Sequence, residues 1–141
     1  MSQNPKTGDI ISACIEEFAE YGYEKANTNR ICERAGVSKG LIFHYFGSKR
    51  KLYLEATEKC VNDLTARFDG FSADGMDYSQ SLLAYIRLKA DFFSENPLHY
   101  KIIAGALHLT ACFHSIWGMQ NMWILINGRV SGNLIKTNKL F

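Results

Sequence analysis

The sequence predicts an all-α fold, in which an N-terminal three-helix head is joined by a long fourth helix to a small C-terminal helical body. Only two prolines, Pro5 and Pro97, interrupt the 141-residue chain, so most of it is free to be helical. Apolar residues recur at three- and four-residue spacings, which is typical of helices that bury one face. Serine and glycine stand where such helices would begin and end. We expect the head to cover residues 1–48 and the fourth helix and body to cover residues 49–141.

The first predicted helix covers residues 7–22. Thr7 or Asp9 can cap its start. Gly22 can end it, because glycine takes the left-handed conformation beyond a helix at little cost. We expect its buried stripe to consist of Ile11, Cys14, Ile15, Phe18 and Ala19.

Two short helices and a longer one follow. Asn27 or Thr28 caps the second helix, in which Ile31 and Ala35 face inward, and Gly36 ends it. Ser38 caps a third helix over residues 39–46, and Ser48 begins a fourth that runs to about residue 68. We expect core positions at Ile31, Val37, Phe46 and Leu52.

The rest of the chain reads as a linker and further helices. Residues 69–77 carry two glycines and three aspartates, which indicates a linker. A fifth helix is predicted over residues 78–94, and Asn96-Pro97 signals the start of a sixth that reaches about Cys112. The expected apolar side of the fifth helix comprises Leu82, Tyr85, Ile86, Phe92 and Phe93.

The overall charge is small, but its distribution is uneven. The chain has 16 Lys and Arg against 14 Asp and Glu, a net charge of +2. Residues 25–51 carry a net charge of +6, between flanks of −4 over residues 1–24 and −2 over residues 52–70. Such a window is either a solvated face or an anion-binding one. No apolar run is long enough to span a membrane and no apolar signal core is present, so we expect a cytoplasmic protein without membrane contact.

Cysteine and histidine spacing gives little support for a metal or a catalytic site. The four cysteines are separated by 18, 28 and 52 positions, without a CxxC pair, which favours reduced thiols in helix cores. His108 and Cys112 have metal-ligand spacing and His114 follows, but no fourth ligand is evident. We expect no metal, no cofactor and no enzymatic activity, because no catalytic arrangement is recognisable.

The informative segment is residues 27–49, in which Ala35-Gly36-Val37-Ser38 joins two short helices as in a helix-turn-helix. The amide-rich helix start at Ser38, Lys39 and Gly40 suits a phosphate. Behind it, apolar and hydrogen-bonding groups could reach base edges or phosphates. These are Leu41, Phe43, His44 and Tyr45. Arg30, one turn into the second helix, is a further candidate for a DNA backbone contact.

At these residues the sequence resembles the tetracycline-repressor (TetR) family of bacterial transcription regulators, over residues 7 to about 68. The resemblance rests on FAEYGY at residues 18–23, on Thr28 with Ile31, and above all on AGVSKGLIFHYFGSKRKLY at residues 35–53. It implies an all-helical homodimer that binds double-stranded DNA at a palindromic operator and a ligand-responsive repressor function. Thr28 and Lys49 match the family's phosphate-contacting positions, and residues 38–45 match the recognition helix and its start.

Two positions depart from the family pattern inside this helix. Phe43 stands where tyrosine is frequent, so a phenol-to-phosphate bond is lost there. Tyr45 stands where histidine is frequent and should keep a phosphate-directed hydrogen bond.

The second part of the chain departs further from the family. After about residue 114 the usual last helices are not recognisable, so we expect a shortened ligand-binding and dimerisation domain. The resemblance implies a small hydrophobic or aromatic ligand near Tyr85, Phe92, Tyr100, His108 and Trp117. Residues 116–126 hold eight large apolar residues in eleven positions and no charge, so we expect a homodimer contact there. The alternative function is a helical interaction module or remnant with little or no specific DNA binding.

Overall fold

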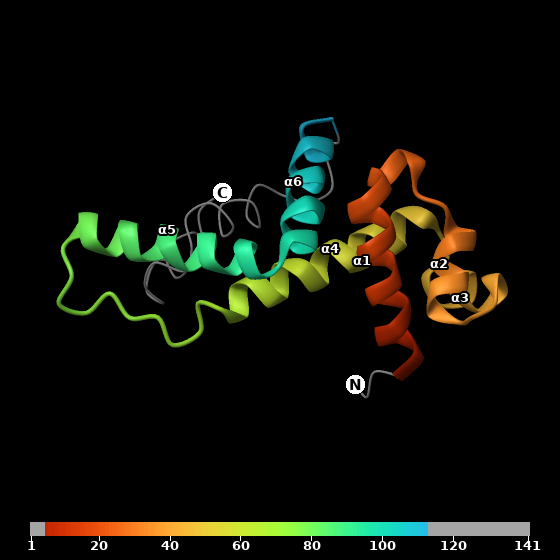
Figure 1. The fold of residues 1–141 in the computed structure, drawn as a ribbon. Coiled ribbons are helices and arrows are strands. Elements are labelled where there is room, and N and C mark those ends of the chain that lie inside the picture. Colours follow the sequence, from red (N-terminus) through yellow and green to blue (C-terminus); the bar gives the residue numbers. More distant parts are fainter. Residues whose placement is uncertain (1–4, 113–141) are drawn as a thin grey trace, which may run out of the picture.

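The computed structural model describes residues 5–112, with the side chains of residues 6–107. Within that range every regular element is a helix, which confirms the predicted all-α class. The head consists of α1 (Pro5–Lys25), α2 (Thr28–Ala35) and α3 (Lys39–Phe46). Helix α4 (Lys49–Ala66) leads away from it, α5 (Tyr78–Glu95) runs back from beyond the far end of α4, and α6 (Pro97–Cys112) rises between α5 and α1 (Figure 1).

The short helices begin and end at the predicted residues. The Asn27 side chain caps α2, Ser38 caps α3, and Ser48 caps α4, each by accepting a backbone N–H of the first turn. Gly36 follows α2 in the left-handed conformation at φ 62°. The linker between α4 and α5 and the start of α6 at Pro97 are confirmed as well.

Helix α1 differs from its prediction at both ends. It begins at Pro5, so Thr7 and Asp9 lie inside it and do not cap it. Gly22 does interrupt the helix, with φ 72° and ψ 171°, but one more turn follows before Lys25. The Ala26 N–H donates to the Gly22 carbonyl at 3.1 Å and closes that turn.

The buried face of α1 includes Cys14, Ile15 and Phe18, as predicted, but it differs from the expected stripe at other positions. Ile10, Ala13 and Cys14 are buried, whereas the expected Ile11 and Ala19 are only half-buried. The reason is that α1 packs against α2, α4 and α6 at once. Glu17 lies in step with this face and is 0% exposed.

One hydrophobic core extends through all the helices of residues 5–112. Ile31 from α2, Ile42 from α3 and Leu52 from α4 are 0% exposed, and Ile102 from α6 is 1% exposed. Val37, predicted as core, packs on this cluster but is only partly buried. This core includes residues on both sides of residue 48, and the expected division of the chain there stays a prediction.

Tyr53 of α4 joins the head to α6. Its ring packs edge-on against Phe18 at 5.0 Å between centroids. Its hydroxyl lies 3.5 Å from the Ile102 carbonyl oxygen and 3.3 Å from where a Cβ on Gly105 would stand. Burial raises the pKa of Tyr53 to about 12, so the hydroxyl stays protonated at neutral pH. Glycine at position 105 lets α6 approach α4 this closely.

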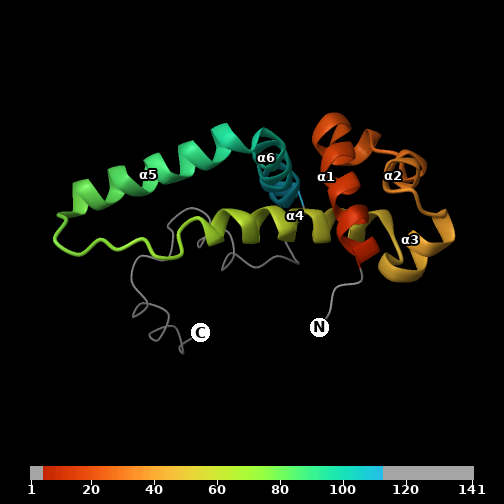
Figure 2. The same ribbon diagram turned by 60° about the horizontal axis from the view of Figure 1, so that its bottom comes forward.

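The apolar side of α5 is only partly as predicted. Phe92 is buried and Tyr85 stacks on Phe68 with ring centroids 4.5 Å apart. Leu82 and Ile86, however, are 46% and 51% exposed, so their prediction as inward-facing residues is wrong. Figure 2 shows the reason, because the first half of α5 lies far from α1 and the head.

The three described cysteines lie in the core. Cys14, Cys32 and Cys60 are free and buried, as predicted for core thiols. Burial raises the pKa of Cys14 and Cys60 to about 12.

Among residues 5–112, we find no helix with the length and apolar character that crossing a bilayer requires. The expected homodimer contact at residues 116–126 lies outside the described residues.

The left-handed turn at Gly36 gives a test of the fold. We expect Gly36→Ala to lower the free energy of unfolding by about 1–2 kcal/mol, because a Cβ is strained at positive φ. The measurement is urea unfolding followed by circular dichroism. Gly8→Ala is the control: Gly8 lies in α1 with open space around it, and there the change should raise stability by about 0.5–1 kcal/mol. Equal effects of the two changes would contradict the prediction.

Candidate nucleic-acid interface

The turn between α2 and α3 fixes the angle at which α3 leaves the head. The Gly36 and Val37 amides donate back to carbonyls in the last turn of α2, the Val37 N–H to Cys32 at 3.0 Å. The Val37 side chain packs on the core, and the chain then passes to Ser38, whose Oγ accepts the Leu41 N–H at 3.2 Å. These local bonds hold α3 across the end of α2 without an irregular loop.

Helix α3 has one buried and one exposed side. Ile42 and Phe46, four residues apart, anchor it to the core. The opposite side presents Lys39, Gly40, Phe43 and His44, all exposed. Because residues four apart share a helix face, these four form one continuous surface.

The remaining recognition-helix candidates flank that surface. Tyr45 is 44% exposed, and its ring meets the His44 ring edge-on at 5.5 Å between centroids. Leu41 is half-buried. The structure thus gathers the predicted recognition residues on and beside one exposed face of α3, where sequence spacing had suggested them.

Lys39 and Lys49 lie at the starts of successive helices. The Lys39 ammonium lies 6.0 Å from the centre of the Phe43 ring, on the exposed face of α3. Lys49 donates to the Glu24 carbonyl at 3.0 Å and lies over the Tyr23 ring at 5.1 Å. An ammonium has three donors, so this bond leaves Lys49 with donors for a phosphate.

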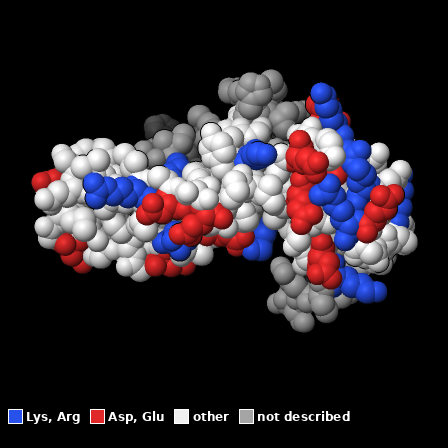
Figure 3. Space-filling view, in the orientation of Figure 1, with Lys and Arg blue, Asp and Glu red and all other residues white. Residues whose placement is uncertain are grey.

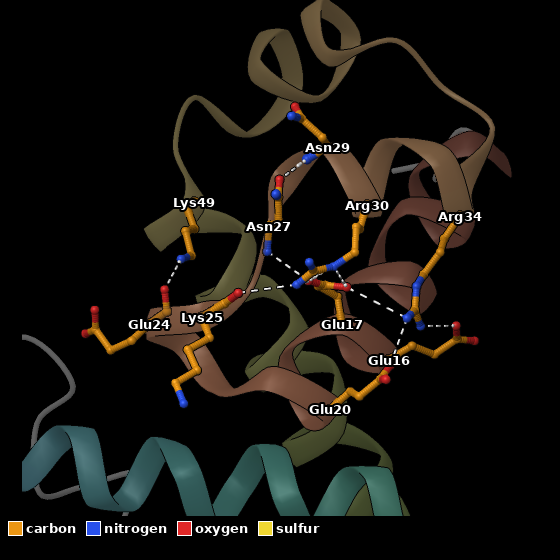
Figure 4. Close-up of polar contacts among 10 residues, drawn as sticks. All are labelled: Glu16, Glu17, Glu20, Glu24, Lys25, Asn27, Asn29, Arg30, Arg34 and Lys49. Carbon is orange, nitrogen blue, oxygen red and sulfur yellow. Dashed lines mark hydrogen bonds and ion pairs between the residues drawn. The ribbon is translucent and has the colours of Figure 1, made fainter.

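Arg30 is placed differently from the expectation of an outward-pointing phosphate contact. Its Nε donates to the two Glu17 carboxylate oxygens at 2.9 and 3.1 Å, and its Nη2 lies 2.6 Å from Oε1 (Figure 4). The guanidinium also lies 4.1 Å from the centre of the Tyr21 ring. Thr28, at the start of the same helix, is half-buried.

Glu17 is a buried, charged residue of the head that the sequence patterns did not single out. It had counted only as part of an acidic flank, yet its side chain is fully buried and also accepts the Asn27 N–H at 2.8 Å. A signal was present, because Glu17 stands three residues after Cys14 and four after Ala13, in step with the apolar stripe. A charged residue in such a position requires a partner of opposite charge.

The environment of Glu17 keeps it ionised. Burial raises the pKa of the carboxyl, but the hydrogen bonds from Arg30 and the Asn27 amide and the charges of Arg30 and Arg34 lower it more. The net result is a pKa below the usual value for glutamate.

Arg34 is also held by ion pairs with glutamates of α1. Its guanidinium pairs with Glu16 at 3.1 Å and with Glu20 at 2.8 Å. Figure 3 accordingly shows acidic and basic side chains side by side over the head on the face that it displays. Part of the +6 window is therefore neutralised within the head.

The expected ligand residues are only partly described, and this set stays a prediction. Phe92 is buried in the core and Tyr85 stacks on Phe68, whereas Tyr100 is 55% exposed. The side chain of His108 and all of Trp117 lie outside the described residues, as do the Cys112 side chain and His114. Among the side chains that are described, no group of three or more potential metal ligands occurs.

The exposed helix after a glycine turn defines this chain as a helix-turn-helix protein. Residues 10–56 match the family model described as bacterial regulatory proteins, tetR family. This N-terminal part of the chain is therefore similar to the DNA-binding part of the TetR family.

Known relatives extend this similarity beyond the head. The chain is 29% identical over 103 residues to the transcriptional activator FasR of Mycolicibacterium smegmatis, covering 73% of this chain and 47% of FasR. It is 31% identical over 88 residues to the regulator RutR of Escherichia coli K12, covering 62% of this chain and 41% of RutR. It is 48% identical over 46 residues to the repressor AcnR of Corynebacterium efficiens, covering 33% of this chain and 24% of AcnR. The chain thus aligns with less than half the length of these relatives.

Solved structures share the fold. A Streptomyces coelicolor protein described as a transcriptional regulator matches with a TM-score of 0.61 and 30% identity, over 72% of this chain and 52% of that one. A TetR-like regulator from Rhodococcus sp. RHA1 matches with a TM-score of 0.74 over 89% and 69% of the two chains. At 14% identity, the second match concerns the fold alone.

The depressed pKa of Glu17 predicts how stability changes with pH. At pH 7 we expect Glu17→Gln to lower the free energy of unfolding by about 1–3 kcal/mol, because Arg30 is left without its charged partner. The folded pKa lies below the unfolded value of about 4.3. The contribution is therefore complete above pH 5 and is lost as the pH falls through the folded pKa.

The measurement is urea unfolding of the wild type and Glu17→Gln between pH 7 and pH 3. The difference in stability between them should shrink as the pH falls. A difference that stays constant over this range would contradict an ionised Glu17.

Proposed function

We propose that this chain is a DNA-binding transcription regulator, acting as a repressor whose α3 enters the major groove of an operator. The observation that carries the proposal is the exposed face of α3, with Lys39, Phe43 and His44 opposite the buried Ile42 and Phe46. Large aromatic groups exposed beside a lysine at a helix start suit base edges and phosphates. The similarity to FasR, RutR and AcnR, which are all transcription regulators, supports it.

The contacts divide into two kinds. Thr28, Lys39 and Lys49 stand at helix starts, where backbone amides and positive charge favour phosphates. Phe43 and His44 lie further along α3 and would reach base edges, with Phe43 suited to a thymine methyl group. Leu41 and Tyr45 flank this surface, and Gly40 leaves room for close approach, since a Cβ there would meet no atom closer than 4.0 Å.

The wider activity follows from the family. A single half-site gives few contacts, so the proposal includes a cytoplasmic homodimer on a palindromic operator, with recognition helices about 34–36 Å apart. A small hydrophobic or aromatic ligand in the second part would change that separation and release the DNA. No enzymatic activity is part of this proposal.

The other candidate function is a helical interaction module with little specific DNA binding. The exposed Leu82, Leu83 and Ile86 of α5 favour it, because they offer an apolar surface for another protein. Sedimentation of the chain with and without DNA from its own upstream region distinguishes the two functions. A complex with two chains per duplex supports the regulator, and no complex at low salt supports the module.

Phosphate contact by Lys39 can be measured through the salt dependence of binding. We expect Lys39→Ala to weaken binding to every duplex and to reduce the slope of log K against log salt by about 0.9, the value for one phosphate contact. Lys101→Ala is the matched control, since Lys101 is an exposed lysine on α6. Fluorescence anisotropy at several salt concentrations gives both slopes. An unchanged slope for Lys39→Ala would contradict the proposed contact.

Base recognition by His44 predicts a different result. We expect His44→Ala to reduce the preference for the operator over a scrambled duplex by about five- to a hundredfold, the range for one lost base contact. Non-specific affinity and the salt slope should remain as in the wild type. Competition binding with both duplexes measures the ratio, and an equal loss on both would place His44 at the DNA backbone.

A further inference from the structure

Glu17 connects α1 to the start of α2 at two points. Its Oε1 accepts the backbone N–H of Asn27, the capping residue of α2, at 2.8 Å. Both carboxylate oxygens accept from Arg30, one turn into the same helix. A buried carboxylate with charge-assisted bonds to both a backbone amide and a guanidinium has a fixed position. The first turn of α2 is thereby fixed relative to α1.

The connection before α2 is also held from the other side. Lys49, at the start of α4, donates to the Glu24 carbonyl at 3.0 Å, and Arg30 Nη2 donates to the Lys25 carbonyl at 3.3 Å. The end of α1 is therefore attached to α4 through Lys49, and residues 27–30 are attached to α1 through Glu17 (Figure 4). Thr28 and Lys49, both proposed to contact phosphates, stand at these attachment points.

The Arg30 side chain is 38% exposed, but its Nε and Nη2 donors are directed toward the protein. Nε and Nη2 bind Glu17, and the guanidinium lies over the Tyr21 ring. Turning this group toward a phosphate would leave the fully buried Glu17 carboxylate without its main counter-charge, which is strongly unfavourable. The geometry therefore favours a structural role for the Arg30 charge.

We propose that Glu17 is a positioning residue for DNA binding, which acts through Arg30 and the Asn27 amide to set the start of α2, and that Arg30 does not itself contact phosphate. This inference rests on the proposed function. It extends that function by dividing the basic residues of the 25–51 segment into two groups. Arg30 stabilises the arrangement of α1 and α2, whereas Lys39 and Lys49 contact the DNA.

The experiment compares DNA affinity in four variants of the full chain, well below their unfolding temperatures. Glu17→Gln removes the carboxylate charge, and Glu16→Gln makes the same change one residue earlier, where the side chain is 53% exposed and pairs only with Arg34. Arg30→Lys keeps the charge but loses the planar fork that bridges both Glu17 oxygens. Arg30→Gln removes the charge. Circular dichroism confirms that each variant is folded.

We expect Glu17→Gln and Arg30→Lys to weaken binding to operator and scrambled duplexes by about tenfold, while Glu16→Gln stays within about twofold of the wild type. The double variant Glu17→Gln/Arg30→Lys should bind no worse than the weaker single variant, because both act through one interaction. Arg30→Gln should keep the wild-type salt slope. Folded Glu17→Gln with wild-type affinity would overturn the positioning role, and a slope reduced by about 0.9 in Arg30→Gln would overturn the assignment of Arg30.

Amide hydrogen exchange at Asn27 tests the anchoring without DNA. Exchange at this amide should be slow in the wild type and in Glu16→Gln and at least tenfold faster in Glu17→Gln, since only the last replaces the charged carboxylate acceptor with the weaker, neutral amide oxygen of glutamine. A wild type that binds neither duplex would overturn the proposed function and this role with it. If the wild type binds DNA but Asn27 exchanges equally fast in all three proteins, the positioning role alone is wrong.

Discussion

A carboxylate removed from water is strongly unfavourable unless charged and polar groups surround it, and Glu17 imposes that requirement on the head. It is met by the Arg30 guanidinium and the Asn27 amide, with Arg34 3.8 Å away. Meeting it fixes how α2 begins against α1. Since only three residues, Gly36, Val37 and Ser38, join α2 to α3, the orientation of the exposed α3 face depends on the same contact.

The hydrophobic core adds a second constraint. Helix α1 packs against α2, α4 and α6, so the head and the beginning of the body share one interior. The Tyr53 hydroxyl beside Gly105 and the Ile102 carbonyl shows how close that packing is. A displacement of α6 would therefore act directly on α4. The first residue of α4, Lys49, is proposed to contact DNA.

The sequence predicted the parts of this structure that depend on local chemistry. The caps at Ser38 and Ser48 and the turn at Gly36 follow from the preferences of single residues, whatever the helices pack against. The exposed face of α3 has the same local origin, because a short helix with Ile42 and Phe46 buried must expose the residues between them, and the role of this face in DNA recognition stays a prediction.

What the sequence did not predict depends on contacts between distant elements. The buried face of α1 is set by helices on several sides, so Ile10 is buried beside the predicted Cys14, Ile15 and Phe18, while the expected Ile11 is only half-buried. Glu17 and Arg30 are thirteen residues apart and become partners only when α2 folds against α1. Leu82 and Ile86 have helical spacing but lie where α5 extends away from the head. The spacing of apolar residues predicts which residues share one face of a helix. Only the tertiary structure determines which element that face packs against.

The linker between α4 and α5 carries a consequence for how the chain is held together. Residues 67–77 are mostly exposed and contain Gly70 and Gly75, both at positive φ. Helix α6, which follows this linker, packs on α1 and α4, which precede it. A protease that cut the linker would therefore not release a free head. The two fragments would stay associated through the interior they share, and the pair could be expressed separately and reconstituted as a split protein.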